Sequence, residues 1–306
     1  MSNWFTNKSV EIVAYKINRR PFAQPELFQP EDPAFPDHLV EALLYDEMIR
    51  ISNIGNRQWQ LGNRQIRSDG TAMSGIVGWQ SVDLEEEDHF DQERTAWVTD
   101  LVPRRHVTVS PFAIDFGTQY LYVVRHSSFG ESAIATVFSD LLQRGEQARE
   151  AGATVNWEVQ PLLDENEFEE WLESITSLDR LQFVAKLPNP DGQEQMEEAL
   201  RLLEDVDATE LRLSVRSTVE NGGLSRDLGQ IATYAALLRM CQRGYASVTA
   251  WGRDLYGAVK HYQQSRQVRR ERRTISSDDL DAARDELSGM LEDLDFGVDD
   301  GDQHAS

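Results

Sequence analysis

The residues in this sequence that could do chemistry are acidic side chains on predicted strands. Trp157-Glu158-Val159-Gln160 places one carboxylate on a strand predicted over Thr154–Val159. Asp115, from an earlier predicted strand, could join it. Two carboxylates beside a lysine could hold a divalent metal ion and orient a water molecule for phosphodiester hydrolysis. One hypothesis is therefore a metal-dependent nuclease with Asp115 and Glu158 as catalytic residues, although such spacing also arises by chance in an acidic protein.

The other reactive side chains indicate no metal site and no cofactor. The six histidines are scattered, and no HExxH pair is present. A single cysteine, Cys241, cannot form an internal disulfide or a cysteine-based zinc site, and it shares an apolar helix face with Leu237 and Leu238. The sequence also lacks a Walker A motif and a GxGxxG motif.

A run of arginines near the C-terminus is the second candidate site. Four of them share one face if a helix continues from His261, namely Arg266, Arg269, Arg270 and Arg273. The guanidinium forks could bind the phosphates of RNA or DNA. They could instead pair with the acidic tail that follows, or simply end a solvated helix whose C-terminal dipole favours cations.

The tail itself combines charge with helical periodicity. Residues 276–306 hold eleven acidic residues and one basic residue, and apolar side chains recur there at three- and four-residue steps. An amphipathic acidic helix suits a partner groove. We therefore expect a protein partner that binds through residues 276–306, and nucleic acid as a second partner at the arginine cluster.

The composition limits the class of protein. The formal net charge is −23, and only four of the 30 basic residues are lysines. Such a composition suits a host with high internal salt or a GC-rich genome, and it argues against broad nucleic-acid binding by phosphate neutralisation. No apolar run approaches the length of a membrane span, and the N-terminus does not resemble a secretory signal. We expect a cytoplasmic protein with no membrane contact.

The order of predicted elements indicates a layered fold. Strands and helices alternate from Pro111 onward, whereas Glu85–Asp88 is interpreted as a charged loop. This order predicts an α+β or α/β protein, a mixed sheet with helices on one face, with two ferredoxin-like halves as one way to arrange it. The predicted domains are an N-terminal mixed region over 1–109, a βα-rich domain over 110–262, and a basic segment with an acidic tail over 263–306.

One stretch resembles a known family. Leu178–Asp191 ends a strand directly in Pro188-Asn189-Pro190-Asp191. With Phe112–Val124, Val137-Phe138, Leu141-Leu142, Leu211–Val215, Gly244–Gly252 and Ser74-Gly75, this stretch resembles a family of unknown function typified by Gop, a host-killing protein of phage satellites. The likeness covers about residues 70–262.

The resemblance implies a biological context, but it assigns no functional residues. It suggests a phage-defence or toxin–antitoxin protein, and it carries no catalytic motif onto any residue of this chain. The leading hypothesis is a protein that acts through macromolecular partners. The alternatives are the metal-dependent nuclease and an RNA-contacting subunit that uses the arginine cluster, so enzymatic activity stays open.

Overall fold

The computed structural model describes most of the chain, with gaps. The described residues are 8–21, 35–44, 49–50, 57–93, 95–149, 155–186, 208, 210–217, 223–266, 269–275, 279–291 and 293–294. The Pro188–Asp191 motif and the tail beyond 294 lie outside the described residues.

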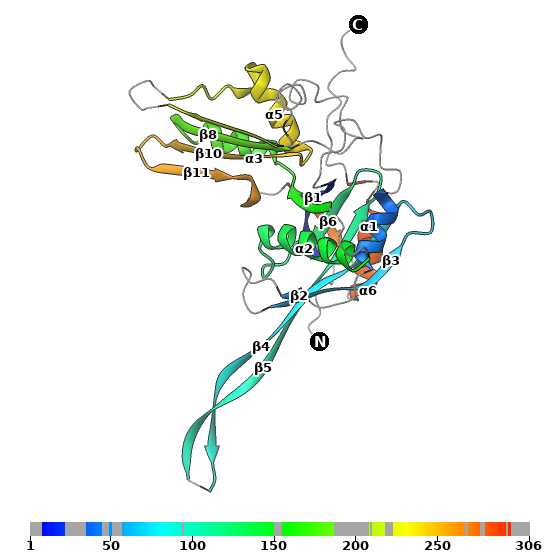
Figure 1. Cartoon of the computed structure of the whole chain (residues 1–306). Helices are drawn as coiled ribbons and strands as arrows, with labels where there is room; N and C mark the ends of the chain where they lie inside the picture. Colours follow the sequence, from blue (N-terminus) through cyan, green and yellow to red (C-terminus); the bar gives the residue numbers. More distant parts are fainter. Residues whose placement is uncertain are drawn as a thin grey trace.

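The described strands form two antiparallel sheets (Figure 1). The first has the order β12-β1-β6-β5-β4-β3-β2, and β7 also pairs with β1. Its strands are β1 (Lys8–Pro21), β2 (Ile49–Arg50), β3 (Gln58–Ile66), β4 (Ala72–Asp91), β5 (Ala96–Asp115), β6 (Tyr120–Val124), β7 (Val155–Pro161) and β12 (Arg270–Ile275).

The side chains of strand β1 are buried on both faces of the first sheet. Alternate side chains of a strand point to opposite faces. Val13, Tyr15 and Ile17 pack with the helices α1 (Phe35–Leu43) and α2 (Glu131–Arg149). Ile12 and Ala14 pack on the other face with α6 (Leu280–Gly289). This run therefore forms a strand that is apolar on both faces, because each face is covered by helix.

The second sheet has the order β11-β10-β8-β9, and the helices that the structure describes pack on one of its faces. Its strands are β8 (Ser177–Lys186), β9 (Glu210–Arg216), β10 (Ala246–Arg253) and β11 (Val259–Gln263). Phe168 of α3 (Glu165–Glu173) and Leu237 of α5 (Ala232–Gln242) share a buried core with Phe183 of β8. The short 3₁₀ helix η4 (Leu228–Gln230) contributes Leu228 to the same core.

Strands β4 and β5 extend far beyond the sheet that they help to form. They pair from Ala72 with Asp115 to Asp91 with Ala96, without a register shift. Their outer half projects from the body as a two-stranded arm (Figure 1). We call residues 80–91 and 96–107 the arm.

The predicted fold class is wrong in two respects. The strand pairings between the described elements are antiparallel, so neither sheet is mixed, and strand outweighs helix. Helices cover both faces of the first sheet rather than one. Part of the error lies at Glu85–Asp88, which belongs to β4. Consecutive charged residues are typical of a solvated loop. They are also compatible with a two-stranded ribbon such as the outer part of β4 and β5, because both of its faces contact water.

The helix predicted to continue from His261 is also absent. A single 3₁₀ turn, η5 (Gln264–Arg266), follows β11, and Arg270–Ile275 then forms β12. Strand β12 pairs with Lys8–Val13 of β1. Hydrogen bonding to a strand more than 250 residues away outweighs the local helical spacing of the arginines.

The predicted tail helix is confirmed as α6, but its apolar face is buried within the chain. Ala283 and Leu287 are fully buried and pack with Ile12 and Ala14 of β1. Arg284, which is 2% exposed, donates from Nη1 to the carbonyl of Asn63 at 2.8 Å. A partner that binds through the tail would have to use its outer face.

The predicted domain boundaries cross continuous elements. Strand β5 runs through residues 109–110, and β12, from the C-terminal segment, completes the first sheet. Within the part of the chain that is described, no helix is long and apolar enough to cross a membrane.

A buried carboxylate fastens α2 to the first sheet. The fully buried Glu146 side chain accepts hydrogen bonds from Arg19 Nη2 at 3.1 Å, Arg149 Nη2 at 2.7 Å and Trp157 Nε1 at 2.9 Å. Burial opposes ionisation, but these three donors lower the pKa of Glu146 from 4.5 to about 2. A depressed carboxyl pKa stabilises the fold above pH 4.5, and this contribution is lost as the pH falls toward 2.

Replacing Glu146 should expose this contribution. We expect Glu146→Gln to lower the free energy of unfolding at pH 7 by about 3 kcal/mol, because two arginines lose their carboxylate. It should also flatten the loss of stability between pH 4.5 and 2. Urea unfolding, followed by tryptophan fluorescence at several pH values, measures both effects. Asp140→Asn on the same helix removes an exposed pair with Arg144 and should change little.

A second substitution tests whether α6 is part of the body. Leu287→Ala should lower the free energy of unfolding by about 3 kcal/mol, because it leaves a cavity between α6 and the sheet. Ala282→Ser, at an exposed position of the same helix, is the control. Equal stability of both variants in thermal or urea unfolding would mean that α6 is not docked on β1.

Candidate functional site

The face of the second sheet that carries no described helix presents a row of basic and aromatic residues. Arg216 of β9 lies opposite Arg180 of β8, and Arg180 lies opposite Trp251 of β10. Trp251 in turn lies opposite His261 of β11. Directly opposite residues of antiparallel strands share a face, so one row crosses all four strands.

The middle of this row is a stack of planar groups. The Arg180 guanidinium carbon is 4.4 Å from the centroid of the Trp251 ring. The Trp251 and His261 rings stack with centroids 4.9 Å apart and planes 18° from parallel. Arg180 also donates from Nη2 to Gln182 Oε1 at 2.9 Å. The cation–π contact and this hydrogen bond hold the guanidinium in a fixed position on the sheet.

Neighbouring register positions on this face carry hydrogen-bonding and basic groups. The next row consists of Ser214, Gln182, Thr249 and Gln263. Arg212 pairs with Glu210 at 2.6 Å, and Arg253 pairs with Asp179 at 2.9 Å. Arginines therefore outnumber acidic residues on this face, in a chain whose net charge is −23.

The local sequence explains why these side chains share a surface. In β9, Arg212 and Arg216 alternate with apolar Leu213 and Val215. The same alternation places Gln182 of β8 opposite the buried face. The alternation over Glu210–Ser217 indicates a half-exposed strand, but it does not reveal the site, because the other members of the row lie on strands whose register the sequence does not show.

This arrangement can bind a nucleic-acid strand. Guanidinium groups match phosphate oxygens, and aromatic side chains can stack with bases. Amide and hydroxyl groups beside them can donate to and accept from the edges of unpaired bases.

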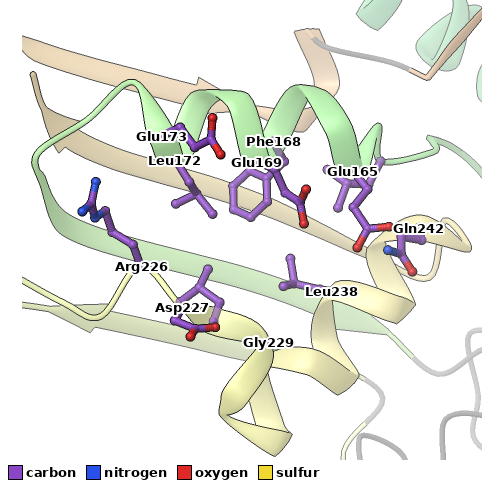
Figure 2. Close-up of a pocket in the computed structure, with 12 residues that line it drawn as sticks. Glu165, Phe168, Glu169, Leu172, Glu173, Arg226, Asp227, Gly229, Leu238 and Gln242 are labelled. Carbon is purple, nitrogen blue, oxygen red and sulfur yellow. The ribbon is translucent and has the colours of Figure 1, made fainter.

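The face of the second sheet that is covered by α3 and α5 is acidic, in contrast to the basic row. A cleft of about 540 Å³ lies between α3 and the η4–α5 segment (Figure 2). Its floor includes Phe168 and Leu238, and its acidic lining residues are Glu165, Glu169, Glu173 and Asp227. Burial, together with the Glu169 and Asp164 carboxylates, raises the pKa of Glu165, which Arg269 partly offsets. An acidic cleft repels phosphate, so the sheet face is the better surface for a nucleic acid.

The predicted catalytic residue Glu158 lies where the two sheets meet. Its Oε1 accepts from Lys186 Nζ at 2.5 Å and from Gln160 Nε2 at 2.7 Å. Asn18 of β1 lies directly opposite it and donates from Nδ2 to the carbonyl of Gly244 at 3.2 Å. Glu158 therefore forms part of the contact that joins β7 to β8.

The second predicted catalytic residue, Asp115, has a different local partner. Its Oδ1 accepts from the Thr118 backbone N–H at 2.9 Å and so closes the β5–β6 turn. The buried Lys16 donates from Nζ to the Thr118 carbonyl at 2.7 Å. Among the residues that the structure describes, no group of three or more histidine, cysteine, aspartate or glutamate side chains could hold a metal ion.

The arginine cluster is divided between the two faces of β12. Arg270 lies opposite Val13, whereas Arg273 lies opposite Val10 on the other face. Arg273 faces the tail, where Nη2 donates to the Asp293 carbonyl at 2.7 Å, and it also pairs with Glu271. The Arg269 backbone carbonyl bonds Ala14 N–H at 3.3 Å, and the Arg266 side chain lies outside the described residues. The shared face of four arginines is therefore not formed.

Comparisons with known proteins assign a family without a function. A search of curated proteins finds no match. A family model described as a domain of unknown function matches residues 76–292, from β4 to the end of α6. It includes β12 and α6, which the Gop-like resemblance left out, and it gives that resemblance no support. Because the match spans more than half of the chain, this protein belongs to the family described as Domain of unknown function (DUF4747).

Proposed function

We propose that this protein binds single-stranded nucleic acid on the face of its second sheet that carries no described helix. The observation that carries the proposal is the row of Arg216, Arg180, Trp251 and His261, which places phosphate-binding and stacking groups side by side. The protein then acts by binding a macromolecule, as the leading hypothesis from the sequence requires.

A single strand fits this surface better than a duplex does. Arg180 and His261 flank the Trp251 ring, so a base of a single strand stacks on the outer face of the exposed His261 ring and reaches the polar row beside it. A duplex hides its bases, and its binding relies on many phosphate contacts. The acidic residues elsewhere on the chain oppose such broad contact, so binding concentrates on this one face.

The other functional predictions are ranked below this proposal. A phage-defence or toxin–antitoxin setting rests on the Gop-like resemblance of the sequence alone, and nucleic acid is a suitable target in that setting. Hydrolysis by Asp115 and Glu158 has no specific observation in its favour, because each carboxylate has a separate local partner. Nucleic-acid contact by Arg269 and Arg270 stays a prediction.

Two substitutions on the row test the proposal. We expect Arg180→Ala with Arg216→Ala to raise the Kd for a fluorescent single-stranded RNA or DNA oligonucleotide by about tenfold, and to reduce the slope of log K against log salt by about two. Trp251→Ala should weaken binding by a similar factor, because it removes the ring that holds Arg180 and His261 in place, with less change in the salt slope. Fluorescence anisotropy at several salt concentrations measures both quantities.

Matched variants separate this face from other arginines. Arg144→Ala removes an exposed arginine of α2, and Arg272→Ala removes an exposed arginine of β12. Both should bind the oligonucleotide like the wild-type chain. Loss of binding in Arg272→Ala alone would move the site to the arginine cluster. Absence of binding by the wild-type chain to RNA and DNA oligonucleotides of mixed sequence would refute the proposal.

A further inference from the structure

The arm has two faces of different character. The even-numbered residues 80–90 of β4 share one face with the odd-numbered residues 97–107 of β5, as their register shows. This face carries five large apolar side chains, each more than half exposed, namely Val82, Leu84, Trp97, Leu101 and Val107. We call it the apolar face of the arm.

The opposite face of the arm satisfies its own charges. Glu85 Oε1 is 2.9 Å from His106 Nε2, and Arg104 Nη2 is 2.5 Å from Glu87 Oε2. His89 Nε2 is 3.7 Å from Asp100 Oδ2. These contacts link β4 to β5 across one face, and they leave this face well suited to water.

The apolar face carries charges that lie at different levels along the arm. Arg105 is near the body, and it makes no ion pair within the described part of the chain. Glu86 and Asp88 lie farther out, toward the tip. Asp88 accepts a hydrogen bond from Thr99 Oγ1 at 2.7 Å, which leaves its second oxygen available. The face is therefore basic near the body, where Arg105 lies, and acidic beyond its middle, where Glu86 and Asp88 lie; apolar side chains lie between these levels and at the tip, where Trp97 lies.

A two-stranded ribbon is marginally stable alone in water and usually needs a covering layer. The long arm keeps an unbroken register while its apolar face is exposed. A contiguous exposed apolar surface rimmed by charges marks an interaction site. A partner surface must therefore complement apolar side chains as well as a basic group near the body and acidic groups farther out.

We propose that the apolar face binds the same face of a second copy of this chain, with the two arms running in opposite directions. Such a two-fold contact is self-complementary, because each patch meets its own copy reversed. It brings the Val82–Arg105 level of one copy over the Asp88–Thr99 level of the other. Leu84 and Pro103 of one copy then lie over the Glu86–Leu101 level of the other, as in two stacked sheets. Leu101 packs against the apolar pair, and Glu86 lies beside Asp88 on the side that meets Arg105.

The charge order selects this arrangement over the alternatives. Two arms stacked in the same direction would place like charges together at both ends, whereas reversed arms pair Arg105 with Asp88 twice. Addition of a strand to the open edge of the arm would leave the apolar face exposed. A second copy is the one occupant whose matching surface is present in this sequence.

Sedimentation velocity of the full chain over a range of concentrations tests the proposal. We expect a reversible dimer for the wild-type chain and a monomer for Leu84→Asp. Leu255→Asp is the matched control, because Leu255 is also exposed but lies outside the arm; it should remain dimeric. Circular dichroism checks that each variant is folded. A wild-type chain that stays monomeric at every concentration, or a Leu84→Asp chain that stays dimeric, overturns the proposal.

A charge exchange identifies the second copy as the occupant. Arg105→Glu and Asp88→Arg should each raise the dimer Kd by about tenfold, because each creates two like-charge contacts in a two-fold dimer. An equimolar mixture of the two variants should regain wild-type association, since a mixed pair has opposite charges at both contacts. If each variant is weakened and the mixture stays weak, the reversed pairing is excluded. These outcomes do not depend on nucleic-acid binding, so they are separate from the test of the second sheet.

Discussion

The structure depends on the hydrogen-bond ladder of β1. This one strand pairs with β12 along its first half, with β7 along its second half and with β6 on its other edge. The beginning, the middle and the end of the chain therefore meet on a single strand. Buried backbone groups need hydrogen-bond partners, so the sheet would be lost if either edge of β1 were left unpaired. The body of the protein is built outward from it.

This central strand also positions the second sheet. Asn18 at the end of β1 bonds the turn at Gly244, which leads into β10. Gly244 has a φ of +75°, and a Cβ there would lie 2.3 Å from the Cβ of Lys16. A side chain would force the two layers apart, so the close approach needs glycine at this position. The ion pair between Glu158 and Lys186 adds to this contact, so the Glu158 carboxylate lies where the two sheets meet.

The two candidate surfaces lie on parts of the fold that burial does not constrain. Both surfaces present alternate residues of antiparallel strands, one on the face of the second sheet that carries no described helix and one on the apolar face of the arm. In each case the opposite side of the same strands is already satisfied, by a core in the second sheet and by ion pairs in the arm. Charge is therefore segregated by face, and a chain of net charge −23 can still present a local basic row.

The sequence by itself determined the local elements with strong periodicity. The strand at the start of the chain, the β5–β6 hairpin, α2, α5 and the tail helix follow from the spacing of apolar residues, because that spacing reflects a buried face. The sequence also determined the absence of a cysteine-based metal site. It did not determine where these elements dock: the apolar stripe of the tail indicated a partner, but α6 covers the chain's own β1.

Only the tertiary structure decided the register, and with it both surfaces. The row of Arg216, Arg180, Trp251 and His261 draws one residue from each of four strands, and pairing between distant segments leaves no local pattern in the sequence. Long-range pairing also explains why the arginine segment forms β12 and not a helix, because its partner strand β1 lies at the other end of the chain. Periodicity reports whether one face of a segment is buried, whereas long-range hydrogen bonding decides which residues of different segments become neighbours.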